Sequence, residues 1–547
     1  MTKNFRRSLI VLIALAPAAL MGQGQGLAPA DIYKPLADSW PTYCGDYSCK
    51  RYSALKQIDQ TTVKNLTLSW VSRVVAGAGG GGVPTTIGGE GSGEFPMTDT
   101  VNLTGTVLAV DGTLYISGQD NAWAMDARTG RVLWHYFWKT RGATHIANRG
   151  MGMWNNYLFF ETPDDVLISL DARTGKERWH VEISDFKQQY FSTMAPIVID
   201  NHVLVGTGND IDAPGFLQSY DPETGKRQWI FYTVPMNPGD PGLDTWASLE
   251  AARHGGAQAW LPGAFDPETR LYIFGTGNPT PAYTVGRGEG DNLFTCSLIA
   301  VNVDTGKMAW YYQTSPHDMH DWDSAQTPIL LDTVIAGRTR KLVSTAARNG
   351  WFFTLDRVTG ENMVTTKYGT AANWAKGFNK MNAPKLDPEK VANVPGALVT
   401  GSTTNWWPPA YSPEANLFYV PENNSYAISY LMEPDPRGSM GLGGRTSGAV
   451  GSVGNFITAV EPLTGRVAWL HELLGGGGAT GMLTTAGRLL FAGDGGGNLV
   501  AFDVVRGRPI WHSRLGGVSN APQTYMLDGK QQLLSIAGDQ VFVFTLY

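Results

Sequence analysis

Short apolar segments separated by turn residues recur along the chain, and within them apolar and polar positions alternate. Residues 113–119 (TLYISGQ) and 202–208 (HVLVGTG) are examples. This period of two is typical of β-strands that are half buried in a sheet. The pattern therefore predicts an all-β protein.

Many of these strands belong to one repeat: an apolar pair, usually an acid, two variable residues, Thr-Gly, three variable residues and Trp. Asp and Thr-Gly are turn formers, and Gly readily takes a positive φ. The repeat thus predicts a strand–turn–strand unit whose Trp packs on the neighbouring unit. It occurs at 124–134, 169–179, 219–229, 300–310 and 459–469, in degenerate form at 354–364 and 501–511, and as a strand end at Trp70.

The shorter repeat intervals match one four-stranded blade each, and the longer ones need insertions. The chain is therefore predicted to be an eight-bladed β-propeller with tryptophan-docking repeats, and residues 31–547 to form one such domain. A string of unrelated hairpins is the alternative.

Residues 1–30 resemble a targeting segment. Lys3, Arg6 and Arg7 precede an apolar stretch over 8–21, which is short for a membrane span and typical of a secretory signal. We expect export, to the periplasm or beyond, and no membrane span in the mature chain; an uncleaved anchor is the alternative. In an oxidising compartment Cys44 and Cys49 could pair, which would leave Cys296 as a buried thiol.

Composition narrows the function classes. Of 547 residues 66 are Gly, only 16% are charged and the net charge is −6, so neither a disordered chain nor a nucleic-acid-binding surface is indicated. Three cysteines exclude a disulfide scaffold and a multi-cysteine metal protein.

Five motifs are more specific than the fold: NRG (148–150), TMAP (193–196), GTGNP (275–279), SPHDMHDWD (315–323) and ARNG (347–350). With the repeat, they make the chain resemble the alcohol dehydrogenases that use pyrroloquinoline quinone (PQQ). The resemblance spans roughly residues 40–545. It implies a PQQ cofactor and a metal ion, Ca²⁺ or a lanthanide.

The resemblance also implies roles for individual residues. Asp321 corresponds to the catalytic acid–base group, and Arg348 to the arginine at the reactive quinone carbonyl. Asp323 corresponds to the further acid of lanthanide-using relatives, and oxygen ligands suit such hard cations. The expected metal ligands are Asp210, Asn278, Asp321 and Asp323, and the expected cofactor contacts are Arg149, Thr193, Gln258, Trp260, Arg348 and Asn405.

The chain departs from the family at several positions. Asp210 stands where the family has a metal-binding Glu, with Asp212 as a second candidate. Ala143 and Thr144 replace the adjacent cysteines whose disulfide covers the cofactor, and Ala479 replaces a tryptophan.

The expected function is an exported, PQQ- and metal-dependent dehydrogenase that oxidises an alcohol, an aldehyde or a sugar alcohol. The chain contains no Cys-x-x-Cys-His, so we expect a separate electron acceptor such as a cytochrome c. The alternative is a cofactor-less scaffold or binding propeller resembling outer-membrane assembly proteins. A hydrolase on the same frame is a further alternative, but no recognisable motif supports it.

Overall fold

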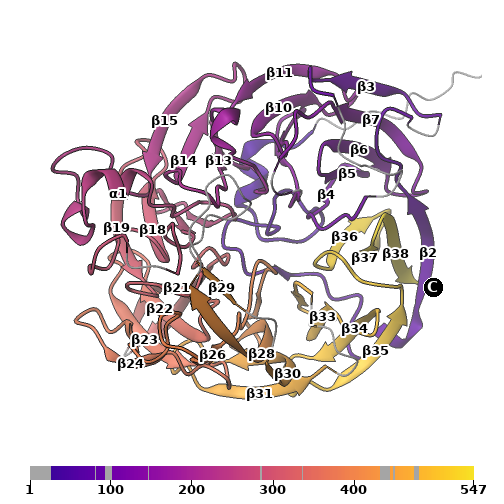
Figure 1. The fold of residues 1–547 in the computed structure, drawn as a ribbon. Helices are drawn as coiled ribbons and strands as arrows, with labels where there is room; N and C mark the ends of the chain where they lie inside the picture. The colour runs from indigo at the N-terminus through magenta and orange to yellow at the C-terminus, as the bar shows by residue number, and fades with distance from the viewer. Residues whose placement is uncertain are drawn as a thin grey trace, which may run out of the picture.

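The computed structural model shows a closed ring of β-sheets (Figure 1). It describes residues 26–547 except 80–81, 93–100, 144, 146, 284–285, 336, 432–443, 447–449, 474–477 and 479. Within this part of the chain, eight sheets of four or more strands are arranged around one axis. The predicted eight-bladed propeller is therefore confirmed.

The first four blades follow the chain in order. Their strands are β4 (Leu108–Val110), β5 (Thr113–Gly118), β6 (Asn121–Asp126) and β7 (Val132–Trp138) in blade 1; β8 (Gly152–Trp154), β9 (Tyr157–Glu161), β10 (Val166–Asp171) and β11 (Glu177–Glu182) in blade 2; β12 (Ile197–Ile199), β13 (His202–Gly206), β14 (Phe216–Tyr220) and β15 (Arg227–Tyr232) in blade 3; and β16 (Ala264–Asp266), β17 (Leu271–Gly275), β18 (Ser297–Asn302) and β19 (Met308–Gln313) in blade 4.

Blades 5 to 8 complete the ring. Their strands are β20 (Ile329–Ile335), β21 (Arg338–Ala346), β22 (Trp351–Asp356) and β23 (Asn362–Lys367) in blade 5; β27 (Ala410–Ser412), β28 (Leu417–Leu431), β30 (Gly451–Val460) and β31 (Val467–Glu472), with β26 (Leu398–Thr400) and β29 (Gly444–Thr446) paired to β28, in blade 6; β32 (Leu483–Thr485), β33 (Leu489–Gly493), β34 (Asn498–Asp503) and β35 (Pro509–Arg514) in blade 7; and β36 (Gln523–Leu527), β37 (Lys530–Ala537), β38 (Gln540–Leu546) and β2 (Leu66–Arg73) in blade 8.

The remaining elements are short. They are β1 (Tyr52–Ser53) beside β32, β3 (Thr85–Gly88) beside β7, the hairpin β24 (Ala375–Phe378) and β25 (Pro384–Leu386), the helix α1 (Leu249–Arg253), and the 3₁₀ turns η1 (Pro29–Tyr33), η2 (Val63–Asn65), η3 (Phe186–Gln188) and η4 (Leu243–Thr245). Among the described residues, none of these helices has the length and apolar character that crossing a bilayer requires.

The ring closes because an early strand completes the last blade. Strand β2 pairs antiparallel with β38, from Leu66 opposite Leu546 to Arg73 opposite Gln540. The sequence predicted that Trp70 lies at a strand end of the eighth unit. Trp70 lies in β2, a strand of blade 8. This pairing closes the ring by joining the N-terminal strand β2 to the C-terminal strand β38 within one blade.

The repeat forms the turn between the third and fourth strand of a blade. In blade 1 the Asp126 carboxylate accepts hydrogen bonds from the backbone N–H groups of Arg128 and Thr129, at 2.8 and 3.0 Å. Gly130 follows with φ 70°. These are the roles that the pattern assigned to Asp and Thr-Gly.

Six of the repeat tryptophans pack on a turn glycine of the next blade, and Trp511 packs on Phe544 instead. A Cβ on Gly175 would lie 2.5 Å from Cε3 of Trp134, and one on Gly225 would lie 2.8 Å from Cε3 of Trp179. Trp134 also donates its indole N–H to the carbonyl of Ala172 in blade 2, at 3.0 Å. Glycine is therefore required here both for its positive φ and for the close approach of the ring.

An N-terminal segment, residues 27–53, occupies the centre of the ring and contacts all eight blades. The innermost strands would otherwise present unpaired edges to the axis. The contacts join Leu27 to Asn155, Asp38 to Met526, Trp40 to Ala109, Tyr47 to Phe265 and Val198, Ser48 to Leu330, Lys50 to Tyr411, and Arg51 to Thr484. Leu27, within the expected leader (residues 1–30), is buried and pairs with Asn155 of blade 2, so this end of the segment packs on the propeller.

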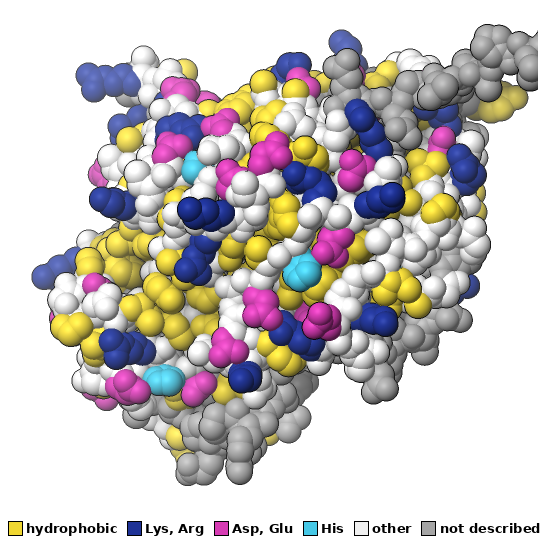
Figure 2. Space-filling model, turned by 90° about the horizontal axis from the view of Figure 1, so that it is seen from above, with side chains coloured by type: hydrophobic (Ala, Val, Ile, Leu, Met, Phe, Trp, Pro, Cys, Tyr) yellow, Lys and Arg dark blue, Asp and Glu magenta, His cyan; other side chains and the backbone are white. Residues whose placement is uncertain are grey.

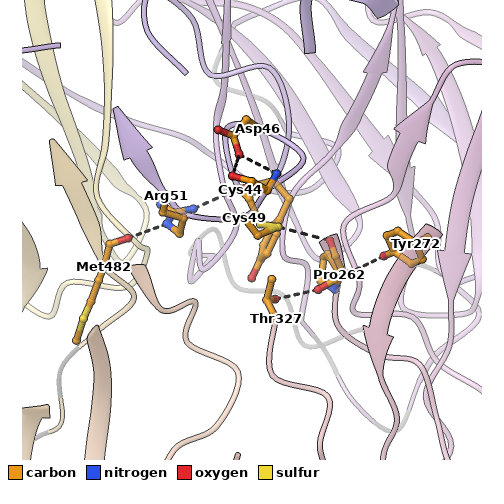
Figure 3. The surroundings of a disulfide bond; sticks show 11 residues. Cys44, Asp46, Cys49, Arg51, Pro262, Tyr272, Thr327 and Met482 are labelled. Carbon is orange, nitrogen blue, oxygen red and sulfur yellow. Dashed lines mark hydrogen bonds between the residues drawn. A yellow bond between two sulfur atoms is a disulfide. The ribbon is translucent and has the colours of Figure 1, made fainter. Parts of the chain in front are cut away.

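A disulfide between Cys44 and Cys49 closes a small loop of this segment (Figure 3). Both cysteines are buried. Arg51, two residues further on, is also buried and donates to the carbonyls of Met482 (2.7 Å), Tyr43 (3.1 Å) and Pro522 (2.9 Å). The possible pairing is thus present, and Cys296 is a buried free thiol as expected.

Candidate functional site

The predicted site residues lie on loops that emerge at one face of the ring. Neighbouring strands of a blade are antiparallel, so the loop from its second to its third strand and the loop to the next blade lie at the same end. Arg149, Thr193, Gln258, Trp260, Asp321, Asp323 and Asn405 lie on loops between blades, whereas Asp210, Asn278 and Arg348 lie between second and third strands.

These loops surround one cavity of about 280 Å³. All ten predicted residues line it: Arg149, Thr193, Asp210, Gln258, Trp260, Asn278, Asp321, Asp323, Arg348 and Asn405. The volume is close to the lower end of the range for small-molecule sites, about 300–1,000 Å³. Residues separated by as many as 256 positions (149 to 405) thus meet at a single centre.

Arg348 bridges the two aspartates. Its Nη1 donates to Oδ2 of Asp323 at 2.7 Å, its Nη2 to Oδ2 of Asp321 at 3.4 Å, and its Nε to the hydroxyl of Ser402 at 3.0 Å. Oδ1 of Asp323 accepts the backbone N–H of Asn278 at 2.9 Å. Asp323 is therefore held on both oxygens, whereas Asp321 is held on one.

Asp321 and Asp323 are two positions apart and would point the same way in an extended chain, but the backbone at Asp321 is not extended. Asp321 has φ 64°, in the left-handed region that non-glycine residues seldom occupy. The two carboxylates nevertheless converge on Arg348. Unusual φ values of this kind cluster at functional sites.

Burial and charge shift the pKa values of this group. Burial raises the pKa of Asp321 and of Asp323, and the Arg348 guanidinium acts against this effect. Burial alone would lower the pKa of Arg348, but the two aspartates raise it. One guanidinium faces two carboxylates, so the cluster favours binding of a further positive charge.

Asp210 lines the cavity at its more exposed side. Its side chain is 27% exposed, compared with 7% for Asp323, and its Oδ2 lies 2.7 Å from Nε2 of His145. Asp212, the second candidate for this position, lies outside the cavity and is 56% exposed beside His254. Of the two, only Asp210 belongs to the site.

Two tryptophans flank the buried Arg149. Its guanidinium carbon lies 4.9 Å from the ring centroid of Trp260 and 5.2 Å from that of Trp406. Nη1 donates to the carbonyl of Thr193 at 2.9 Å, while Nε of Arg149 and Oε1 of Gln258 are buried without a partner in the described part of the chain. A cavity lined by unsatisfied polar atoms and an aromatic face suits a planar, polar, acidic ligand.

The donor set also suits a hard cation. Asp210, Asn278 and Asp321 each have a side-chain oxygen, Oδ1, that accepts no hydrogen bond from another described residue. Asn278 donates its amide N–H to the carbonyl of Pro279 at 2.9 Å, which leaves its oxygen as the available atom. In the described part of the chain, no three His, Cys, Asp or Glu side chains converge closely enough to hold a metal by themselves. A metal here would therefore need the Asn278 oxygen as well as carboxylates.

Three ring-bearing residues of the cavity wall were not predicted, namely His145, Phe191 and Trp406, and neither were the small residues Ala147 and Gly208. Trp406 directly follows the predicted Asn405, and His145 directly follows the departures at Ala143 and Thr144. Ala143 is half-buried, whereas Thr144 and Ala479 lie outside the described residues. The sequence signal for Trp406 and His145 was their place next to these positions, and none of the five motifs contains Phe191.

Two family models match the chain. One, described as "Glucose/ethanol/alcohol dehydrogenase, beta-propeller domain" and concerned with PQQ proteins, matches residues 40–373. The other, described as "Outer membrane protein assembly factor BamB", matches residues 454–545. The first match contains every cavity residue predicted above except Asn405, and the second contains none of them.

Individual relatives agree with the first match. A quinohemoprotein alcohol dehydrogenase from Comamonas testosteroni is 32% identical over 91% of this chain and 72% of its own. The quinoprotein alcohol dehydrogenase PedH from Pseudomonas putida is 33% identical over 79% of this chain and 78% of its own.

Solved structures agree as well. The crystal structure of the Comamonas testosteroni quinohemoprotein superimposes with a TM-score of 0.82 at 28% identity, over 95% of this chain and 82% of the other. A europium-containing methanol dehydrogenase superimposes with a TM-score of 0.80 at 25% identity, over 94% and 99%.

Proposed function

The chain belongs to the PQQ-dependent alcohol dehydrogenase family, and on this premise we propose that the ten predicted residues around the cavity form its cofactor and catalytic site. The protein is an oxidoreductase of that family, with PQQ and either Ca²⁺ or a lanthanide as cofactors. The observation that supports the site is that residues from eight loops converge on one cavity: the five loops that join blades 1 to 6 in sequence, and the loops within blades 3, 4 and 5.

Asp321 is the proposed base. Its Oδ1 accepts no hydrogen bond from another described residue, so it can accept the proton of a substrate hydroxyl. Burial raises the pKa of Asp321, which makes its carboxylate a stronger base. Asp323, held by Arg348 and the backbone of Asn278, keeps the guanidinium in place.

Arg348 supplies positive charge where negative charge develops during the reaction. Its guanidinium is fixed by Asp321, Asp323 and Ser402, so little reorganisation is needed. When bound, PQQ accepts the substrate's electrons and the metal ion polarises its reactive carbonyl. Asp210, Asn278, Asp321 and, through its remaining lone pairs, Asp323 would hold that ion.

Arg149 and Trp260 are the proposed anchors of the cofactor. PQQ is a planar tricarboxylate, and Arg149 has a buried N–H group without a described partner. The guanidinium now covers the Trp260 ring, so it must move aside for the planar ligand to stack there. Thr193, Gln258 and Asn405 complete the proposed contacts.

The substrate is an alcohol, in keeping with the family. We propose that electrons leave to a separate acceptor such as a cytochrome c, because the chain contains no Cys-x-x-Cys-His. Export to the periplasm or beyond is supported by the sequence of residues 1–30 and by the disulfide of Cys44 and Cys49, a bond typical of oxidising compartments.

The test is a titration of the purified protein with PQQ, followed by tryptophan fluorescence, with La³⁺, with Ca²⁺ and without metal. We expect saturable quenching that requires a metal, because the cavity holds Trp260 and Trp406 beside excess negative charge. Asp321→Asn should lower the rate of alcohol-dependent dye reduction by about 10²–10⁴-fold through loss of the base. Asp212→Asn, outside the cavity, is the matched control. Absence of binding under every condition would leave the scaffold alternative.

A further inference from the structure

His145 lies at the rim of the cavity, in the loop between β7 and β8. It directly follows positions 143 and 144, where the PQQ-dependent alcohol dehydrogenases have two adjacent cysteines. The side chain is 42% exposed and lines the cavity together with Phe191 and Asp210. It was not among the predicted site residues.

Two contacts hold the imidazole in this position. Its ring centroid lies 4.6 Å from that of Phe191, with an angle of 46° between the ring planes. Its Nε2 lies 2.7 Å from Oδ2 of Asp210. Phe191 is itself buried, so it provides a firm surface for the ring.

The Asp210 side chain depends on this contact. The neighbouring Asn209 holds the loop backbone, because its side-chain oxygen accepts the N–H groups of Ile211, Asp212 and Ala213. The Asp210 carboxylate, by contrast, has His145 as its hydrogen-bond partner among the described residues. With Oδ2 bound to the imidazole, Oδ1 is the atom left for a ligand.

We propose that His145 is a positioning residue that orients Asp210 as a ligand of the metal ion. The inference rests on the proposed function of the cavity. The Asp210 side chain is shorter than the Glu that the family has at this position, so it reaches less far toward a metal ion. A hydrogen bond that fixes the orientation of the carboxylate offsets part of that loss of reach. Residues that orient metal ligands in this way change metal affinity by about 10–100-fold when they are replaced.

The experiment measures the La³⁺ concentration at which PQQ quenching is half-maximal, in the full-length protein. His145→Phe keeps an aromatic ring on Phe191 but removes the donor, and should raise this concentration by about 10–100-fold. His145→Gln keeps an N–H at a similar distance and should stay within about threefold of the wild type. His254→Phe is the matched control, because His254 also faces an aspartate, Asp212, but outside the cavity. The thermal midpoint of each metal-free variant separates loss of metal affinity from loss of fold.

The outcomes are distinguishable. If the wild type shows no metal-dependent quenching, the proposed function fails and the inference fails with it. If the wild type responds to La³⁺ and His145→Phe responds at the same concentration, only the role of His145 is overturned. A His145→Gln variant that loses as much affinity as His145→Phe would also overturn it, because the donor would then be irrelevant.

Discussion

At the scale of single residues, the interior of this propeller holds several carboxylates whose surroundings disfavour charge. Asp120 is an example outside the cavity: it is buried, its Oδ1 accepts the amide of Asn121 at 2.7 Å, and its Oδ2 has no partner in the described part of the chain. Burial raises the pKa of Asp120 to about 7, and the nearby Asp164 adds to the effect. The proton is therefore bound more tightly in the folded than in the unfolded chain.

This shift predicts how stability depends on pH. A carboxyl group with a raised folded pKa stabilises the fold fully below its unfolded pKa, near 4, and loses that contribution as the pH rises to about 7. Asp120→Asn removes the charge. The free energy of unfolding of this variant, relative to that of the wild type, should therefore increase between pH 4 and 7, by the order of 3 kcal/mol. Thermal unfolding from pH 4 to 8 measures it. The exposed Asp244→Asn is the control, and a constant difference across this range would contradict the assignment.

At the scale of elements, one contact is repeated around the ring: a tryptophan of one blade against a turn glycine of the next. The same glycine also closes the turn with positive φ, as Gly175 does with φ 67°. The degenerate copy at 354–364 shows what happens without the indole. There, Gly465 of the next blade faces Thr366 instead, so the backbone geometry persists when the tryptophan is absent.

Gly175→Ala tests whether the tryptophan contact adds to the stability that the turn glycine provides through its positive φ. The new methyl group would need a left-handed backbone, at about 1 kcal/mol, and would also overlap the Trp134 ring, at about 1–3 kcal/mol more. Gly529→Ala is the matched control, because Gly529 has φ 76° but nothing within 4 Å of the added Cβ. We expect Gly175→Ala to lower the thermal midpoint more than Gly529→Ala does. Equal effects would mean that the ring contact contributes nothing.

At the scale of the whole molecule, two features hold the ring together. Strand β2 joins the ends of the propeller through β38, and residues 27–53 pair with the inner edges of the blades. Acidic and basic side chains are interspersed over the face seen in Figure 2.

Arg51 anchors the central segment to residues near both ends of the chain. Its guanidinium is buried, lies 4.8 Å from the Trp40 ring centroid and donates to carbonyls from both ends of the chain. Arg51→Met would leave those carbonyls without donors, at roughly 1–3 kcal/mol each. We expect a clearly lower thermal midpoint, partly restored by Arg51→Lys. The exposed Arg131→Met is the control, and a midpoint equal to that of the wild type would show that the carbonyls find other donors.

Much of the site was predictable because its residues sit in short motifs on loops of a regular fold. Asp321, Asp323 and Arg348 were predicted from two such motifs, and they meet within hydrogen-bonding distance. The orientation of each side chain was not predictable. Nothing in the local sequence indicates that Arg149 covers Trp260, or that Asp323 is held on both oxygens.

The sequence by itself determined the strands, the turns, the number of blades and the tryptophan contacts, because these follow from a local period and from residue types repeated at fixed spacing. Tertiary structure alone decided that residues 27–53 fill the centre of the ring and that His145 meets Asp210. Both depend on contacts between residues far apart in the chain: 65 positions separate His145 from Asp210. Such contacts form only when separate blades pack together, and no local pattern records which side chains will then face each other.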